Sequence, residues 1–167
     1  MSTHQIGVVL DCMVYLQAAA NSKSTAARLL DLADSGELTL FVSRETLYEI
    51  RETLNDTEVR AKLSGVTDVQ VKILFMRLEK KAILIKQIPK RFEYPRDPKD
   101  EPYINLALAA DATYIVSRDN DLLDSMKWNT EEGREFQKRF RFLKIVTPEV
   151  FLDEIGKRKA LERVRPT

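Results

Sequence analysis

The chain has 167 residues, of which 44% are hydrophobic and 32% charged, and its formal net charge is +1. These values predict one globular domain with its own core, and they exclude a disordered chain and a binder that holds nucleic acid by net charge alone. The apolar runs are shorter than a membrane span, and the N-terminus lacks a basic segment followed by an apolar one, so we expect a cytoplasmic protein without membrane association.

The first half of the chain alternates strand and helix patterns. Short β-branched runs predict buried parallel strands, and apolar residues at helical spacing predict the helices between them. In chain order we expect a strand at residues 6–10, helices at 13–20 and 24–32 with Gly36 closing the second, a strand at 38–42, and a helix capped by Ser43 that carries Leu47, Ile50 and Leu54. Residues 55–67 are polar and receive no assignment.

The second half continues the alternation around two loops. In chain order we expect a helix at residues 69–80, a strand at 82–85, an extended proline-rich loop at 88–99, a helix at 100–110, a strand at 114–116, a short helix or turn at 120–126, a polar insertion at 128–140, a strand at 143–146 and a helix at 148–155 that Gly156 stops. This order predicts a parallel sheet covered by helices on both faces. We expect a single domain with a core at residues 6–152 and a basic tail at 157–167.

Acidic residues stand where ligands bind in such a sheet, beyond the carboxyl ends of the strands. Asp11 directly follows the first predicted strand, and Asp119 follows the fourth. Asp100 opens the helix before the fourth strand, Glu49 lies in the helix after the second, and Asp121 follows Asp119 by two positions. Converging carboxylates repel one another, and Mg²⁺ or Mn²⁺ is the natural counter-charge for such oxygen ligands. Metal-assisted phosphodiester hydrolysis is the chemistry that this pattern favours.

Each acid alone has a plainer interpretation. Asp11 and Asp100 could cap helices, Asp119 could hydrogen-bond its own turn, and Glu49 could be a solvated helix residue. Their joint occurrence at one edge favours the metal site.

Other catalytic constellations have little support. His4 is the only histidine and lies in a predicted loose N-terminus, which argues against a Ser-His-Asp site or a histidine zinc site. Cys12 is the only cysteine and is expected to pack as a small apolar residue. The five glycines form neither a Walker loop nor a dinucleotide fingerprint.

Basic residues gather toward the C-terminus, where residues 134–167 hold ten basic and five acidic side chains. In residues 134–144, phenylalanines alternate with Lys138, Arg139 and Arg141, which suits single-stranded RNA through stacking and phosphate contacts. The alternative, favoured for a charge run alone, is a solvated face whose phenylalanines pack in the core beneath basic side chains.

Three segments together resemble the PIN-domain family. They are V-V-L-D ending at Asp11, S-R-E-T-L-Y-E ending at Glu49, and residues 97–123, the most specific of the three. The resemblance covers residues 6–152 and is closest to the branch of toxin components of prokaryotic toxin–antitoxin pairs. It implies a three-layer α/β/α sandwich around a parallel sheet of about five strands in the order 3-2-1-4-5.

The resemblance also implies an endoribonuclease that uses Mg²⁺ or Mn²⁺. By it, Asp11, Glu49, Asp100 and Asp119 are the metal-site residues, and Asp121 is either a supporting ligand or an acid that supports the ligands. Glu45 and Glu52 compete for the place of Glu49. It further implies a cognate antitoxin as partner and a homodimer. We expect RNA contacts from Arg118, Arg139 and Arg141.

One departure from the family leaves alternatives open. The family commonly has small polar residues after its first aspartate, whereas this chain has Cys12 and Met13, and a methionine cannot donate a hydrogen bond to a nearby carboxylate. A weakened shell around the ligands typically costs about 10–100-fold in metal affinity or activity. A slow enzyme and a non-catalytic RNA- or partner-binding module both fit this departure. A phospho-acceptor receiver domain is a further alternative, but it would need an acidic pair after the first strand and a lysine after the fifth.

Overall fold

The computed structural model describes residues 5–165, so His4 lies outside the described residues. Five parallel strands form one sheet in the order β3-β2-β1-β4-β5, which confirms the predicted order and α/β/α class. The strands are β1 (Ile6–Leu10), β2 (Leu38–Val42), β3 (Ile83–Leu84), β4 (Tyr114–Val116) and β5 (Lys144–Val146). This order differs from the 2-1-3-4-5 order of receiver domains and excludes that alternative.

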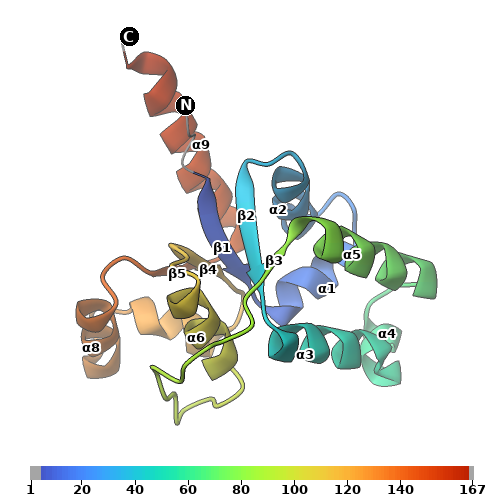
Figure 1. Ribbon diagram of the computed structural model, residues 1–167, viewed down its shortest axis with the longest axis horizontal. Helices are drawn as coiled ribbons and strands as arrows, with labels where there is room; N and C mark the ends of the chain where they lie inside the picture. The colour runs from blue at the N-terminus through green and yellow to red at the C-terminus, as the bar shows by residue number, and fades with distance from the viewer. Residues whose placement is uncertain (1–4, 166–167) are drawn as a thin grey trace.

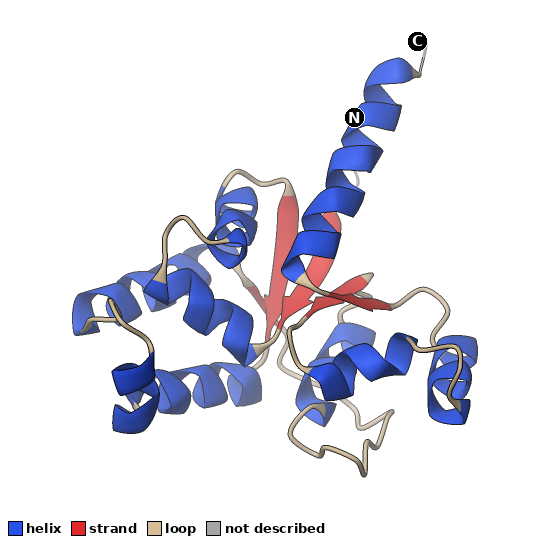
Figure 2. Cartoon of the chain, turned by 180° about the vertical axis from the view of Figure 1, so that it is seen from behind, coloured by secondary structure: helices blue, strands red, loops and turns tan. Residues whose placement is uncertain are grey.

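Helices cover both faces of the sheet, and Figure 2 shows the strands between two groups of helices. The helix α6 contacts β1, β2 and β4, whereas α2 contacts β2 and α9. In chain order the helices are α1 (Cys12–Ala20), α2 (Thr25–Asp34), α3 (Arg44–Asn55), α4 (Thr57–Lys62), α5 (Asp68–Lys81), α6 (Glu101–Ala109), α7 (Asn120–Leu123), the 3-10 turn η1 (Asp124–Met126), α8 (Glu131–Arg139) and α9 (Pro148–Val164).

The two central strands form the middle of the core. Val8 and Val9 of β1 and Ile115 and Val116 of β4 are fully buried, because helices cover these strands on both sides. The predicted cap of the helix after β2 is also present. Ser43 caps α3 in a reciprocal pair of hydrogen bonds with Thr46.

The structure differs from the sequence-based assignment in three segments. Residues 57–62, which received no assignment, form α4, capped by the side chain of Asp56. The predicted polar insertion contains α8, an amphipathic helix that buries Phe136 and is followed by the buried Phe140. Both helices are short, and a short helix is stabilised mainly by packing against the rest of the fold rather than by its own sequence.

The third difference is at the C-terminus, where Gly156 does not stop the last helix. The helix α9 continues through Gly156 to Val164, so the predicted tail is mostly helical. A glycine inside a helix costs about 1 kcal/mol relative to alanine, which good helix formers on both sides can offset. Gly36, by contrast, has a φ of +83° after α2 and ends that helix as expected. Among residues 5–165, no helix has the length and apolar character needed to cross a bilayer.

Candidate metal centre

The candidate site lies where β1 and β4 end side by side. Leu10 and Val116 are paired in the parallel register, and the amide of Asp11 donates to the carbonyl oxygen of Val116 at 3.1 Å. Residues 11 and 117 therefore leave the sheet together. This is the edge at which ligands bind in open α/β sheets.

A buried serine links the two strand-end aspartates. Ser117 is fully buried, and its hydroxyl donates to Oδ2 of Asp11 and accepts from the amide of Asp119 at 2.9 Å. Burial raises the pKa of Asp11, and the hydrogen bonds from Ser117 and Val14 oppose that shift. Ser117 was not among the predicted site residues, although its place at the end of a strand, two residues before Asp119, is a usable signal.

Three carboxylates converge next to this pair. Asp97, Asp100 and Asp119 each offer an oxygen, and these oxygens lie within 4.8 Å of one another. Burial, and then the charges of Asp119, Asp97 and Asp11, raise the pKa of Asp100 to about 8. Asp97 was not among the predicted site residues, although it precedes Asp100 by only three positions in R-D-P-K-D.

Asp100 does not serve as a helix cap. Its side chain makes no capping hydrogen bond to α6, and its buried Oδ2 has no hydrogen-bond partner. Asp11 and Asp119 do cap helices: Oδ1 of Asp11 accepts from the amide of Val14 at 3.1 Å, and Oδ1 of Asp119 accepts from that of Asp121 at 2.8 Å. The plainer interpretation therefore holds in part for these two, and it is wrong for Asp100.

Glu49 reaches the same region from α3. Its Oε2 accepts a hydrogen bond from the hydroxyl of Tyr103 at 2.6 Å, and Tyr103 lies one turn after Asp100 in α6. The competing residues Glu45 and Glu52 are exposed, whereas Glu49 is half-buried. Burial and the bond to Tyr103 thus distinguish Glu49 from Glu45 and Glu52, but Glu49 is outside the three-carboxylate cluster.

Asp121 has a different partner. Its carboxylate forms an ion pair with Nε of Arg96 at 2.9 Å, and its carbonyl oxygen accepts from the hydroxyl of Tyr94 at 2.6 Å. Arg96 also pairs with Asp124 at 2.7 Å. These contacts hold the proline-rich loop against α7, so the structure gives Asp121 a place beside the cluster and a role in fixing the loop.

A buried asparagine fixes the other end of that loop. Oδ1 of Asn105 accepts from the amides of Arg91 and Phe92 at 3.0 and 2.9 Å, and its Nδ2 donates to the carbonyl oxygen of Phe92 at 3.0 Å. Asn105 lies in α6, the helix that begins just after Asp100. One helix therefore positions two acids of the cluster, Asp100 directly and Asp97 through the loop.

The predicted RNA-contacting arginines are outside the acidic cluster. Arg118 donates to Glu149 at 3.0 Å and to Gln17 at 2.6 Å. Arg139 donates to the carbonyl oxygen of Arg91 at 2.7 Å and stacks on the ring of Phe140. Among residues 5–165, Arg141 makes no ion pair or side-chain hydrogen bond.

The phenylalanines of residues 134–144 divide between the two interpretations. Phe136 and Phe140 are buried, as the core interpretation predicted, but Phe142 is 88% exposed.

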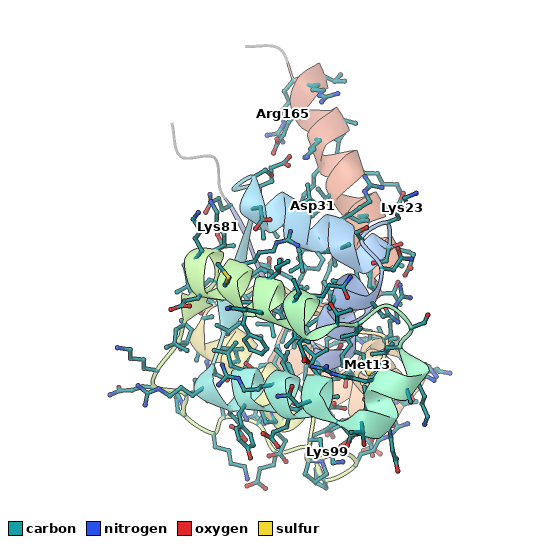
Figure 3. The ribbon with its side chains drawn as sticks, turned by 90° about the vertical axis from the view of Figure 1, so that its right-hand side faces the viewer. Met13, Lys23, Asp31, Lys81, Lys99 and Arg165 are labelled. Atoms are coloured by element: carbon teal, nitrogen blue, oxygen red, sulfur yellow. The ribbon has the colours of Figure 1, made fainter. Side chains whose placement is uncertain are left out.

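The basic end of α9 lies far from the acidic edge. Figure 1 shows it projecting beyond the start of β1, and Figure 3 places Arg165 at the opposite end of the molecule from Lys99, the neighbour of Asp100.

Met13 lies on the first turn of α1, two residues after Asp11, and is 46% exposed. Figure 3 shows it toward the same end of the molecule as Lys99. Its thioether offers no hydrogen-bond donor at this position.

Comparison with known proteins agrees with this geometry. The family model described as the PIN domain matches residues 7–121, a span that contains every acid of the candidate site. An uncharacterized protein of Methanocaldococcus jannaschii is 27% identical over 157 residues, which cover 94% of this chain and 96% of that protein.

Proposed function

Since the chain belongs to the PIN domain family, whose members are generally metal-dependent nucleases, we propose that it is an endoribonuclease that depends on Mg²⁺ or Mn²⁺. The observation that carries the proposal is the buried Oδ2 of Asp100, which has no partner although two further carboxylates lie beside it. A buried polar atom without a partner is costly, and a cation is the partner that three converging carboxylates fit best.

The chain's acids take distinct roles in this proposal. Asp97, Asp100 and Asp119 hold the cation, and Ser117 orients Asp11 at the neighbouring position on the rim. Glu49, held by Tyr103, orients the attacking water from the α3 side. A divalent cation bound there would make water more acidic and stabilise negative charge on the phosphoryl group.

Residues around the acids complete the site. Asp121 supports it by holding Arg96 and the loop that carries Asp97. Arg118 precedes Asp119, and we propose that it contacts a phosphate of the RNA once its ion pair with Glu149 opens. Arg139 and Arg141 are proposed to contact RNA farther from the cluster.

The decisive test compares the wild type with Asp11→Asn and Asp119→Asn on RNA, with Mg²⁺, with Mn²⁺ and with chelator. We expect cleavage by the wild type alone, and only with metal. Glu52→Gln is the control, because Glu52 is an exposed acid on the same helix as Glu49. This variant should cleave RNA at the wild-type rate. Cleavage that persists in both aspartate variants, or in chelator, would contradict the proposal.

We further propose that the protein is the toxin of a toxin–antitoxin pair, acting in the cytoplasm as a homodimer under a cognate antitoxin. The support is the resemblance of its motifs to that branch of the family. Expression in a bacterial host should arrest growth, and Asp119→Asn should abolish the arrest while accumulating to the same level. Equal toxicity of the two proteins would contradict this assignment.

A non-catalytic RNA- or partner-binding module is the second candidate, and Met13 is the observation that favours it. A thioether replaces a hydrogen-bond donor beside Asp11, so the support around the ligands is reduced. Met13→Asn should raise the cleavage rate if the first proposal holds. RNA binding without cleavage in both the wild type and Met13→Asn would select the binding module.

A further inference from the structure

Two large aromatic side chains lie exposed on the β5 side of the molecule. Trp128, in the turn before α8, is 58% exposed, and Phe142, just before β5, is 88% exposed. Their neighbours Phe136 and Phe140 are buried. Exposed rings present flat apolar faces on which a planar group can stack.

Unpaired cations surround these aromatics. Among residues 5–165, the side chains of Arg91, Lys138 and Arg141 form no ion pair with a carboxylate. Lys144 pairs with Glu154 only at 3.7 Å. The surface therefore presents positive charge that the chain itself does not neutralise.

The same residues line two surface cavities. A cavity of about 570 Å³ contains Trp128, and one of about 490 Å³ contains Phe142; Lys138 and Arg141 line both. Across the two, five basic side chains face two acidic ones, Asp111 and Glu154. Both depressions are open to solvent.

We propose that this surface is a binding site for single-stranded RNA, separate from the acidic cluster. Bases stack on Trp128 and Phe142, and phosphates contact Arg91, Lys138 and Arg141. An aromatic face with adjacent cations is the combination that holds single strands without reading sequence. The inference deepens the proposed function and rests on it for the choice of RNA as the ligand.

The position of this surface fits a strand that continues past the cleavage site. Thr113 and Leu143, which line the second cavity, precede β4 and β5, whereas Asp119 follows β4. The second cavity therefore lies toward the amino ends of β4 and β5, whereas the first runs along β5 and includes Met126 of η1. The surface formed by the two cavities is lined by none of Asp97, Asp100 and Asp119. It would hold RNA on the flank of the molecule and leave the metal ligands free.

Trp128 is the only tryptophan of the chain, so its fluorescence reports on this surface alone. The experiment titrates a short oligouridylate into the full-length protein in chelator, where no metal-dependent cleavage occurs. We expect quenching in the wild type and equal quenching in Asp119→Asn. Phe142→Ala should weaken binding by roughly 5- to 150-fold, the effect of one lost stacked base, and Phe142→Tyr should restore it.

The charge contribution is tested by the salt dependence of the same titration. Lys138→Ala with Arg141→Ala should lower the slope of log affinity against log salt by about 0.7 for each lost phosphate contact. Arg163→Ala with Arg165→Ala removes the same charge from the exposed end of α9 and should leave affinity and slope unchanged.

Three results would overturn the inference: no quenching in the wild type, an equal loss in the α9 variant, or equally tight competition by polyglutamate, which has charge but no bases. Cleavage in Mg²⁺ without quenching would refute this surface and leave the nuclease intact. Quenching without cleavage would refute the nuclease and support the surface.

Discussion

At the scale of single residues, Asp100 is the most constrained group of the site. Its Oδ2 reaches neither solvent nor a donor, and burial together with the charges of four nearby carboxylates raises the pKa of Asp100. A carboxyl group in that position holds either a proton or a cation. Its protonation should therefore be visible in the stability of the metal-free protein.

In chelator, the free energy of unfolding that Asp100 contributes should fall as the pH rises from about 4 to about 8. The folded state keeps the proton up to about pH 8, whereas the unfolded chain releases it near the ordinary pKa of 3.8, so the folded state binds more protons in this interval. Urea unfolding at several pH values should show Asp100→Asn gaining stability over the wild type as the pH increases. Parallel curves would contradict the raised pKa.

Removal of the buried hydroxyl that joins two aspartates should weaken both stability and metal binding. Ser117→Ala leaves Oδ2 of Asp11 without its donor, which should cost about 1–3 kcal/mol in urea unfolding. Calorimetry with Mn²⁺ should show affinity lower by about 10–100-fold, the usual effect of losing a group that orients a ligand. The exposed Ser35→Ala is the control, and unchanged affinity in Ser117→Ala would refute the orienting role.

Asp100 and Asp119 of the three-carboxylate cluster were predicted from the sequence, and Asp97 was missed. Asp11 and Asp119 were identifiable because parallel strands end at one edge. Asp97 was not, because it stands in a proline-rich loop whose path depends on Asn105, and no local pattern fixes that path. Ser117 was passed over because a buried serine cannot be told from an exposed one without its neighbours.

At the scale of elements, α6 and the loop before it act as one unit. Asn105 and Glu101 of α6 accept hydrogen bonds from the backbone amides of Phe92 and Tyr94, and the loop then carries Asp97 to the cluster. Regular strands and helices were largely predictable from apolar periodicity. The short helices α4 and α8 were not, because a single amphipathic turn or two gives too little pattern to distinguish from a polar loop.

Release of the loop should impair the site from a distance. Asn105→Ala removes three hydrogen bonds to the loop, so we expect a loss of about 1–3 kcal/mol in stability and weaker Mn²⁺ binding. Hydrogen exchange should show faster exchange at the amides of Arg91 and Phe92. Asn129→Ala, an exposed change near α8, should do none of this, and full Mn²⁺ affinity in Asn105→Ala would argue against the coupling.

The continuous α9 predicts a stabilising substitution. A Cβ added at Gly156 would meet no atom within 4 Å, and Gly156 lies in the interior of the helix. Gly156→Ala should therefore raise the free energy of unfolding by up to about 1 kcal/mol, measured by urea denaturation. At Gly133 an added Cβ would lie 1.9 Å from the carbonyl oxygen of Lys127, so Gly133→Ala should destabilise the protein instead.

At the scale of the whole molecule, metal binding and folding should be linked, because acids from distant segments meet only in the native state. Mn²⁺ should raise the melting temperature of the wild type, with a gain of about 2.7 kcal/mol at 100 times the dissociation constant. Asp119→Asn should lose this response. Asp68→Asn, which alters an exposed acid on α5, should keep it, and an equal shift in all three proteins would indicate unspecific binding.

The pairing of β1 with β4 also sets when this site can exist during synthesis. Asp11 is synthesised more than a hundred residues before Ser117 and Asp119, its neighbours across the sheet. A nascent chain in which β4 has not yet been made carries isolated aspartates and no cation pocket. The proposed nuclease site therefore forms only after β4 has been made and has joined the sheet. Until then, the RNA around the growing chain is not exposed to the proposed activity.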